Sequence, residues 1–517
     1  MPKLEEHKGE LLESRPESRI FRGFPYSIYE VLQPPFSEKE KRLADLLVKV
    51  IARSASLTAL ITEFGSKNTP LAEQFRNSVV QFIDINGLIH RLPDPKQIEI
   101  LKINLLPLVE KLEIEHKKEF IQYVLDNSIG YGEISSLMAN PQLEEIMVNG
   151  KDRAIFVFHR KLGNCKTNIV VNEKSGIPEL VKRISTTVDR QFNEMHPLLD
   201  ARLPDGSRAN ATFDYVSPFG HTLTIRKFSK IPLSIIDLIA NETLNSDLAS
   251  FLWTMIEGLK VHQMNTVITG GTGTGKTTFM NILAEFIPFD ERIVSIEDTV
   301  ELDLGARENW IQLESRPKIK DMLPVSMNDL LRNTLRMRPD RIVVGEVRSE
   351  EAKTLFVSMD LGHRGILGTV HSNNPRELMI RLKSAPMNVP EQMLPLLDMV
   401  IVMERHYDKK KGMIRTVKQV AEIGRMEEKV LISNIFDLNE KTGQVERTTV
   451  PSALIENLAR SAGLTKNELK REILVRKRIL DYMIEAGIRK TEDVEKTIQQ
   501  YYFNPETIMR KITQDLQ

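Results

Sequence analysis

The residues Gly270–Thr277, with the sequence Gly-Gly-Thr-Gly-Thr-Gly-Lys-Thr, constrain this chain more than any other feature. They match the pattern G-x-x-x-x-G-K-[ST], in which glycines let successive backbone N–H groups point at phosphate oxygens. We expect Lys276 to reach the β- and γ-phosphates and Thr277 to donate its hydroxyl oxygen to Mg²⁺. The apolar pair Val267-Ile268 before the loop predicts a strand, and a helical segment ending at Pro288 follows, as the motif requires. The predicted nucleotide contacts are Gly270, Gly271, Thr272, Gly273, Thr274, Gly275, Lys276, Thr277 and Thr278.

Strand and helix patterns alternate from Asn265 onward. Apolar runs predict strands at 266–269, 292–296, 341–344, 365–370 and 399–403, and most of them are separated by helical stretches. This order predicts an α/β fold, with a parallel sheet covered by helices.

Acidic side chains follow two of these predicted strands. Glu297 and Glu301 lie in Ile296-Glu297-Asp298-Thr299-Val300-Glu301, and Glu346 follows the strand at 341–344. Ligand residues collect at the carboxyl ends of strands in open α/β sheets, where carboxylates can hold a metal and orient an attacking water. A single acid after a strand is more often a helix cap or a solvated residue, but two in one phosphate-binding domain favour a functional role.

Two histidines, His363 and His371, bracket another predicted strand. Either could sense the γ-phosphate and relay its loss to the fold. Two structural histidines would explain the spacing equally well.

The rest of the chain divides by composition and periodicity. Residues 1–36 are charged and contain four prolines, which predicts a flexible arm. Helical spacing predicts a helical N-terminal region over 37–139, in which Ser37 caps the first helix. The remaining predicted parts are an α+β N-terminal domain over 140–229, a linker over 230–245, the phosphate-loop domain over 246–451 and a helical C-terminal region over 452–517.

Composition limits the partners and the cellular compartment that we expect for this chain. Lys and Arg total 71 and Asp and Glu total 71, so the balanced charge does not demand nucleic acid or an anionic membrane as the main partner. The single cysteine, Cys165, excludes a disulfide framework and a four-cysteine zinc site, so a reducing cytoplasm is the simplest compartment. We find neither an apolar signal segment nor a run approaching 18 apolar residues, and therefore expect the protein to reach a membrane only through a partner.

Four blocks, in their order and spacing, resemble the secretion ATPase superfamily, the hexameric motors of type II secretion, type IV pili and archaeal flagella (archaella). The phosphate loop is the first, Ile296–Leu302 resembles the family's aspartate box, and Gly362–Asn373 resembles its histidine box. Arg338–Arg348 resembles its atypical Walker B segment, in which glycine replaces the usual aspartate before the glutamate. Upstream, Asn140–Gly150 is similar to the start of the family's N-terminal domain.

The resemblance implies roles by matched position. Glu301 would be the catalytic glutamate that accepts a proton from the attacking water or orients it, with Glu297 or Glu346 as alternative holders of that role. Glu346 would also support Mg²⁺, together with Thr277. His371 would contact the γ-phosphate region, with His363 secondary.

The segments 202–208 and 224–227 resemble the family's arginine-bearing segments. The resemblance makes Arg202, Arg208 and Arg226 candidates to place guanidinium charge on the phosphates, because a planar, permanent cation suits a developing phosphoryl charge. Without the family, each would be an ordinary surface residue.

Two departures from the bacterial pattern point to the archaeal branch of the family. Many bacterial pilus and secretion members carry a four-cysteine zinc module, which Cys165 alone cannot supply. The stretch Arg478–Glu506 and the long helical region before residue 140 also resemble the archaeal branch.

The resemblance therefore implies a RecA-like P-loop ATPase domain, preceded by the α+β domain and the helical region. It implies an ATP-hydrolysing, Mg-dependent motor of an archaeal archaellum or of a type IV pilus-like assembly or secretion system. Such a motor would be a homo-oligomer, by family expectation a hexamer, at the inner face of the cell membrane. Its partners would be a polytopic platform protein and pilin or archaellin export machinery.

Two other functions stay open. A DNA-translocating or conjugation-type ring ATPase would find support in Arg405, Lys409-Lys410-Lys411 and Arg415, although Asp408 interrupts this basic run and the segment resembles a solvated loop. A scaffold that binds nucleotide without turnover would not need Glu301 and Glu346.

Overall fold

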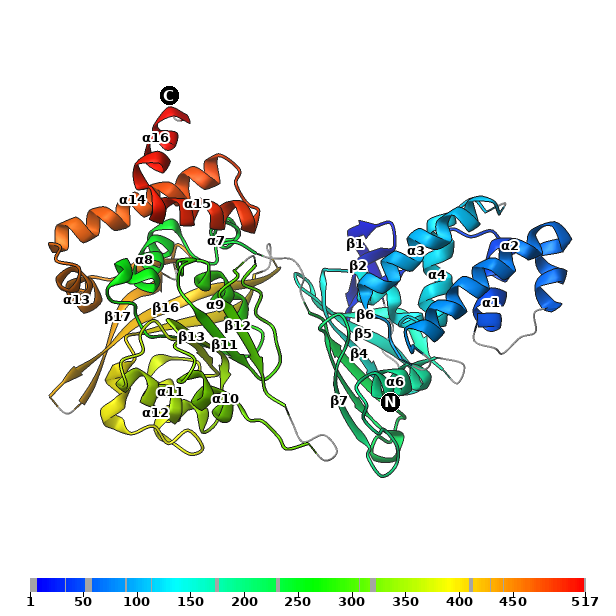
Figure 1. Ribbon diagram of the computed structural model, residues 1–517, viewed down its shortest axis with the longest axis horizontal. Helices are drawn as coiled ribbons and strands as arrows, with labels where there is room; N and C mark the ends of the chain where they lie inside the picture. The colour runs from blue at the N-terminus through cyan, green and yellow to red at the C-terminus, as the bar shows by residue number, and fades with distance from the viewer. Residues whose placement is uncertain are drawn as a thin grey trace. The chain divides into compact units, whose positions relative to one another are not determined.

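The computed structural model describes residues 7–32, 34–51, 58–88, 91–112, 114–172, 176–228, 233–305, 307–316, 322–408, 412–427, 429–439 and 441–515. It divides into two compact units, Met1–Ile231 and Pro232–Gln517 (Figure 1). Among the described residues, no helix combines the length and the apolar character needed to cross a bilayer.

A nine-stranded sheet forms the centre of the second unit. In spatial order the strands are β12-β11-β13-β14-β10-β15-β16-β17-β18; the first six run parallel, and the remaining pairings are antiparallel. Their bounds are β10 Thr266–Gly270, β11 Ile293–Glu297, β12 Trp310–Glu314, β13 Arg341–Val347, β14 Leu367–Val370, β15 Met399–Asp408, β16 Gly412–Met426, β17 Lys429–Asn439 and β18 Gln444–Arg447.

Helices cover both faces of this sheet, as Figure 1 shows. Alternate residues of β10 therefore enter different cores: Ile268 packs with α8 and α9, and Val267 packs with α11 and α12. Each such side chain contributes about 1.5–3 kcal/mol by leaving water, which explains why the parallel strands are apolar runs without alternation. The helices are α7 Ile235–Ala240, α8 Ser246–Glu257, α9 Lys276–Ala284, α10 Met327–Thr334, α11 Glu351–Asp360, α12 Pro375–Lys383, α13 Ala453–Ser461, α14 Lys466–Glu485, α15 Thr491–Phe503 and α16 Pro505–Asp515.

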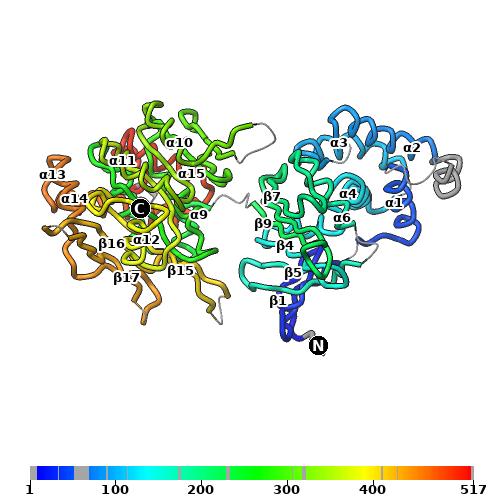
Figure 2. The backbone as a smooth tube through the Cα atoms, turned by 90° about the horizontal axis from the view of Figure 1, so that it is seen from below, coloured from blue at the N-terminus to red at the C-terminus, as the bar shows by residue number. Residues whose placement is uncertain are grey.

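The first unit has a sheet of its own, in the order β1-β2-β3-β6-β5-β4-β9-β8-β7, and a separate helical cluster made by α1–α4. Figure 2 labels the helical cluster α1–α4 and the strands β1, β4, β5, β7 and β9 of this unit. The strands are β1 His7–Arg15, β2 Ser18–Phe24, β3 Ser27–Val31, β4 Leu143–Asn149, β5 Arg153–His159, β6 Gly163–Val171, β7 Leu198–Arg202, β8 Arg208–Thr212 and β9 Thr222–Arg226. The helices are α1 Glu38–Ile51, α2 Thr58–Ile85, α3 Pro95–Glu110, α4 Lys117–Ser128, α5 Ser135–Ala139 and α6 Ile177–Thr187.

The predicted fold class is confirmed: a RecA-like α/β phosphate-loop domain is preceded by an α+β domain and a helical region. The five strands predicted for the phosphate-loop domain are present, as β10, β11, β13, β14 and β15. Ser37 caps α1 as predicted, because the Ser37 hydroxyl accepts the N–H of Glu40 and the Glu40 carboxylate accepts the N–H of Ser37.

The flexible arm predicted over 1–36 is wrong for residues 7–31, which form β1–β3; residues 1–6 lie outside the described residues. β3 pairs in parallel with β6, so this segment extends the sheet of the first unit. Most of the charged side chains that indicated an arm are exposed, as at Glu17, Arg19 and Arg22. Ile20 and Tyr29, by contrast, are only 2% exposed.

The linker predicted over 230–245 is also wrong for most of its length. Residues 229–232 lie outside the described residues, and α7 begins at Ile235. Ser234 and Asp237 form a capping box at its start, and Ile235 and Ile236 are fully buried in the core of the second unit. A further difference is β12, an edge strand that the sequence analysis does not predict.

Candidate functional site

The phosphate loop lies at the carboxyl end of β10, between this strand and α9. Within the loop, Lys276 Nζ donates to the carbonyl oxygens of Gly270 at 3.1 Å and Gly271 at 2.9 Å, and the Thr274 hydroxyl donates to Gly271 at 2.9 Å. The lysine side chain therefore folds over the loop it belongs to. Thr277 and Thr278 lie in the first turn of α9, with Thr277 half-buried and Thr278 exposed.

Three predicted side chains reach the same edge of the sheet as this loop. β11, β13 and β14 run parallel to β10, so their carboxyl ends share its edge. Glu297 is the last residue of β11, Glu346 is near the end of β13 and His371 follows β14. His371 Nε2 lies 3.0 Å from the Thr272 hydroxyl, which joins the histidine box directly to the phosphate loop.

Glu346 is held as a carboxylate. Burial alone would raise its pKa, but a hydrogen bond from Arg348 at 2.5 Å and the positive charges of Arg348, Lys276 and His371 outweigh burial and lower the pKa below its ordinary value. Arg348 was not singled out by the sequence analysis.

The environment of Glu297 shifts its pKa in the opposite direction, above the ordinary value. Glu297 is 1% exposed, and burial raises its pKa to about 7, although its carboxylate accepts the backbone N–H groups of Glu301 at 2.9 Å and Leu302 at 3.0 Å. Glu297 thus fixes the backbone of the segment that carries Glu301. The Glu301 side chain is itself half-buried, which leaves it accessible to water.

His363 does not join this group. It precedes β14, whereas His371 follows it, so the two histidines stand at opposite edges of the sheet. Four residues of strand separate those edges by roughly 13 Å. His363 lies in the turn where its N–H donates to the carbonyl of Ser358.

The three candidate arginines lie side by side in the first unit. Arg202 of β7 is directly opposite Arg208 of β8, and Arg208 is directly opposite Arg226 of β9. Residues that face each other in this way project from the same face of a sheet. The structure therefore brings Arg202, Arg208 and Arg226 together in one row across three strands.

Two arginines beside the phosphate loop were assigned differently by the sequence analysis. Arg405 of β15 and Arg415 of β16, there considered part of a solvated basic loop, both lie against Gly273. Lys409, Lys410 and Lys411 lie outside the described residues. Arg405 could have been found by the rule that locates Glu297, since it follows a predicted parallel strand at the same sheet edge.

The residues at this edge of the sheet are chemically suited to bind Mg²⁺, although the protein alone would not supply all of the ligands. Among the described residues, no three His, Cys, Asp or Glu side chains are arranged to hold a metal. Mg²⁺ commonly uses one or two protein oxygens together with substrate phosphates and water, so a large cluster is not required. The ionised Glu346 beside Lys276 and the half-buried Thr277 hydroxyl are suitable oxygen ligands.

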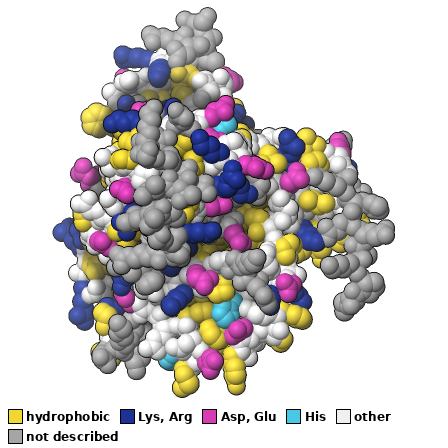
Figure 3. Space-filling model, turned by 90° about the vertical axis from the view of Figure 1, so that its right-hand side faces the viewer, with side chains coloured by type: hydrophobic (Ala, Val, Ile, Leu, Met, Phe, Trp, Pro, Cys, Tyr) yellow, Lys and Arg dark blue, Asp and Glu magenta, His cyan; other side chains and the backbone are white. Residues whose placement is uncertain are grey.

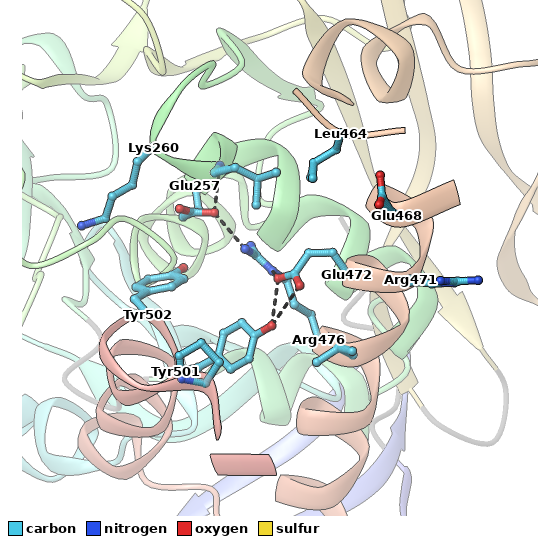
Figure 4. A pocket seen from close by; sticks show the side chains of 12 residues that line it. Glu257, Lys260, Leu464, Glu468, Arg471, Glu472, Arg476, Tyr501 and Tyr502 are labelled. Atoms are coloured by element: carbon cyan, nitrogen blue, oxygen red, sulfur yellow. Dashed lines mark hydrogen bonds and ion pairs between the residues drawn. The ribbon is translucent and has the colours of Figure 1, made fainter. Parts of the chain in front are cut away.

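A pocket of about 570 Å³ lies apart from the phosphate loop, at the junction of α8, α14 and α15 (Figure 4). Arg476 in its wall binds Glu257 at 2.9 Å and Glu472 at 2.8 Å, and its guanidinium lies 5.2 Å from the ring centre of Trp253. None of the predicted nucleotide contacts lines this pocket. The contacts of Arg476 with Glu257 and Trp253 attach the C-terminal helices to α8. We therefore assign Arg476 and its partners a structural role.

Comparisons with known proteins agree with the motifs. A model of the family described as "Type II/IV secretion system protein" matches residues 128–501. An uncharacterized protein of Methanocaldococcus jannaschii is 47% identical over 248 residues, 47% of this chain and 34% of that protein. A second uncharacterized protein of the same organism is 32% identical over 399 residues, 76% of this chain and 71% of that protein. The conjugal transfer protein TrbB of Rhizobium radiobacter is 29% identical over 310 residues, 58% of this chain and 89% of TrbB.

Solved structures of similar proteins include two with related descriptions. The VirB11 ATPase of the Brucella suis type IV secretion system is 25% identical, with a TM-score of 0.29 over 55% of this chain and 90% of that chain. The pilus retraction motor PilT, solved with bound ADP, is 18% identical, with a TM-score of 0.39 over 70% of this chain and 95% of that chain. This chain spans about a third of the length of the first M. jannaschii relative. From the family match and the 32% identical relative, we conclude that the chain belongs to the type II/IV secretion system protein family.

Proposed function

We propose that this protein is an ATP-hydrolysing motor of a type IV pilus-like, archaellum or secretion system. One observation carries the proposal: the Lys276 loop, the carboxylates Glu297 and Glu346, and His371 meet at one edge of a parallel sheet. That arrangement combines a phosphate cradle with Glu346, a carboxylate for the metal, and with Glu297, which holds the segment that carries Glu301.

Binding would start from the phosphate loop. The N-terminal end of α9 and the loop N–H groups attract the phosphates, and Lys276 exchanges its contacts with Gly270 and Gly271 for the β- and γ-oxygens. His371, already 3.0 Å from Thr272, is placed to respond to the γ-phosphate.

Hydrolysis would then need a positioned water. The water oxygen forms a bond to the γ-phosphorus, the bond between that phosphorus and its bridging oxygen breaks, and the proton of the water passes towards Glu301. The products are ADP and phosphate. Glu297 takes no part in bond making; it holds the Glu301 backbone in place through two N–H contacts.

Thr277 and Glu346 are the residues we propose to hold Mg²⁺. The bound ion would neutralise phosphate charge during the transfer. The arginine row Arg202, Arg208 and Arg226 is proposed to supply a guanidinium to the nucleotide, from the same chain or from a neighbouring subunit.

The family and the archaeal relatives support a proposal for the wider assembly. We propose a ring of identical subunits, with six as the expectation, that works in the cytoplasm at the inner face of the membrane. It would act on a polytopic platform protein and on pilin or archaellin export. The similarity to M. jannaschii proteins supports the archaeal assignment.

The conjugal transfer relative TrbB keeps a second function under consideration, a DNA-translocating or conjugation-type ring ATPase. Two features weigh against DNA as the direct substrate. Arg405 and Arg415 lie at the phosphate loop, and on the face shown in Figure 3 the basic and acidic side chains are interspersed. DNA that stimulates hydrolysis at low salt but not at high salt would favour this second function.

Phosphate release from ATP, measured with Mg²⁺ and with a chelator, tests the proposal. The parent protein should hydrolyse ATP only with Mg²⁺, and Lys276→Ala should lose phosphate release while keeping the parent melting temperature. Lys260→Ala, an exposed lysine of the same unit, is the matched control and should match the parent. A Lys276→Ala variant that hydrolyses ATP at the parent rate would overturn the assigned site.

A further inference from the structure

The β15–β16 hairpin carries two arginines to the phosphate loop. Arg405 and Arg415 face each other directly across the two strands. Arg415 Nε donates to the carbonyl oxygen of Gly273 at 3.0 Å, although the two residues are 142 positions apart in the sequence. The hairpin therefore contacts the middle of the loop whose N–H groups would bind phosphate.

This contact determines which way one peptide group points. In a planar trans peptide, the carbonyl of Gly273 and the N–H of Thr274 point in opposite directions. Because Arg415 binds this carbonyl, the N–H of Thr274 is directed away from the Arg415 side chain. The charged donor also polarises the peptide, which makes that N–H a stronger donor to an anion.

Arg405 approaches the same glycine from its α-carbon side. A Cβ added at position 273 would stand 2.6 Å from Arg405 Nη1, and the glycine has φ = +71°, in the left-handed region. Position 273 thus needs glycine for two reasons, its backbone conformation and the closeness of Arg405.

We propose that Arg415 is a positioning residue for phosphate binding, which holds the Gly273–Thr274 peptide with its N–H towards the bound phosphate, while Arg405 lies against Gly273 of the same loop. The inference rests on the proposed function, because it assumes that a nucleoside di- or triphosphate binds this loop. It deepens that function by linking nucleotide affinity to the hairpin.

The test compares Arg415→Met with Arg425→Met, an exposed arginine on the same strand, ten residues further along β16 from Arg415. Binding of a fluorescent ADP analogue and steady-state hydrolysis are measured on the full chain. We expect Arg415→Met to raise Kd and KM about tenfold, as the loss of a charged hydrogen bond predicts, with kcat within about twofold. Arg415→Lys, which keeps the charge and a donor, should recover part of the affinity, and Arg425→Met should match the parent.

Melting temperatures separate positioning from a general structural role. Without nucleotide, Arg415→Met should melt with the parent, but added ADP should raise its melting temperature less. Kd and KM equal to those of the parent would overturn the inference. If Arg415→Met does not fold, Arg415→Gln decides: weaker binding supports the inference and parent-like binding overturns it.

The same experiments distinguish a failure of the proposed function from a failure of the inference on Arg415. If the parent neither binds nor hydrolyses ATP, the function is wrong. If the parent is active and Lys276→Ala is inactive while Arg415→Met binds like the parent, only the inference on Arg415 is wrong.

Discussion

The Glu297 side chain occupies the space next to Gly345: its Cγ lies 2.9 Å from the point where a Cβ at position 345 would stand. Gly345 lies in the segment Arg338–Arg348, which resembles the family's Walker B segment with glycine in place of the usual aspartate. A larger residue would displace Glu297, which accepts the N–H groups of Glu301 and Leu302. Gly345 and Glu297 together therefore set the position of Glu301.

Gly345→Ala should separate catalysis from binding. The added Cβ collides with Glu297 and, at a cost of about 1–3 kcal/mol for overpacking, shifts the segment that carries Glu301. We expect kcat to fall about tenfold or more, as a small misplacement of a catalytic group predicts, with the nucleotide Kd unchanged. Gly424→Ala, a strand glycine with open space around it, is the matched control. Parent kcat in Gly345→Ala would contradict the role given to this contact.

Glu297→Gln should change how stability depends on pH. Burial raises the pKa of Glu297 to about 7, above its ordinary 4.5, so the folded protein keeps a proton that the unfolded chain has released. Its contribution to stability is therefore complete below about pH 4.5 and is lost as pH rises through about 7. The difference amounts to about 3 kcal/mol.

Tryptophan fluorescence during urea unfolding measures this effect in the second unit, since the two tryptophans, Trp253 and Trp310, both belong to it. Relative to Glu297→Gln, the parent should lose unfolding free energy between about pH 4.5 and pH 7. Parallel pH profiles for the two proteins would show that Glu297 does not titrate in this range.

Glu301→Gln should retain ATP binding and stop turnover. The amide keeps the size of the side chain but cannot accept the proton of the attacking water, a loss expected to lower kcat about 10²–10⁴-fold. Equilibrium binding and single-turnover phosphate release separate the two properties. Glu308→Gln, an exposed glutamate nearby, serves as the control. Normal turnover in Glu301→Gln would transfer the role of base to Glu297 or Glu346.

Arg476→Met should weaken the second unit far from the phosphate loop. The Arg476 and Glu257 side chains are 3% and 4% exposed, so removal of the arginine leaves a buried carboxylate without its cation, at a cost of about 3–5 kcal/mol. Lys477→Met, which removes the neighbouring exposed pair with Asp247, should cost about 0–1 kcal/mol. Urea unfolding followed by tryptophan fluorescence compares them, and equal losses would contradict the structural role of Arg476.

Those elements could be predicted in which a local pattern determines structure. Buried parallel strands such as β10 are apolar runs, and Ser37 and Glu40 form a capping box within one turn. Prediction failed where one face of a strand is polar, as in β1 to β3, and at β12, where Gln312 alternates with Ile311 and Leu313.

Parts of the site also depend on contacts between distant segments. The hydrogen bond from Arg415 to Gly273 spans 142 residues, and the contact between Glu297 and Gly345 joins two different strands. Neither contact has a local sequence signal. The positions of the loop and of Glu297, Glu346 and His371 could be predicted because one rule, the shared carboxyl edge of parallel strands, applies to all of them.

The order of strands in the second sheet also has a consequence for synthesis. β10 pairs with β14 and β15, which are made about 100 and 130 residues later. At about 5–20 residues per second, a ribosome needs on the order of ten seconds to complete them after the phosphate loop emerges. During that interval the nascent loop lacks both neighbouring strands, so we expect nucleotide to bind only after translation has passed β15.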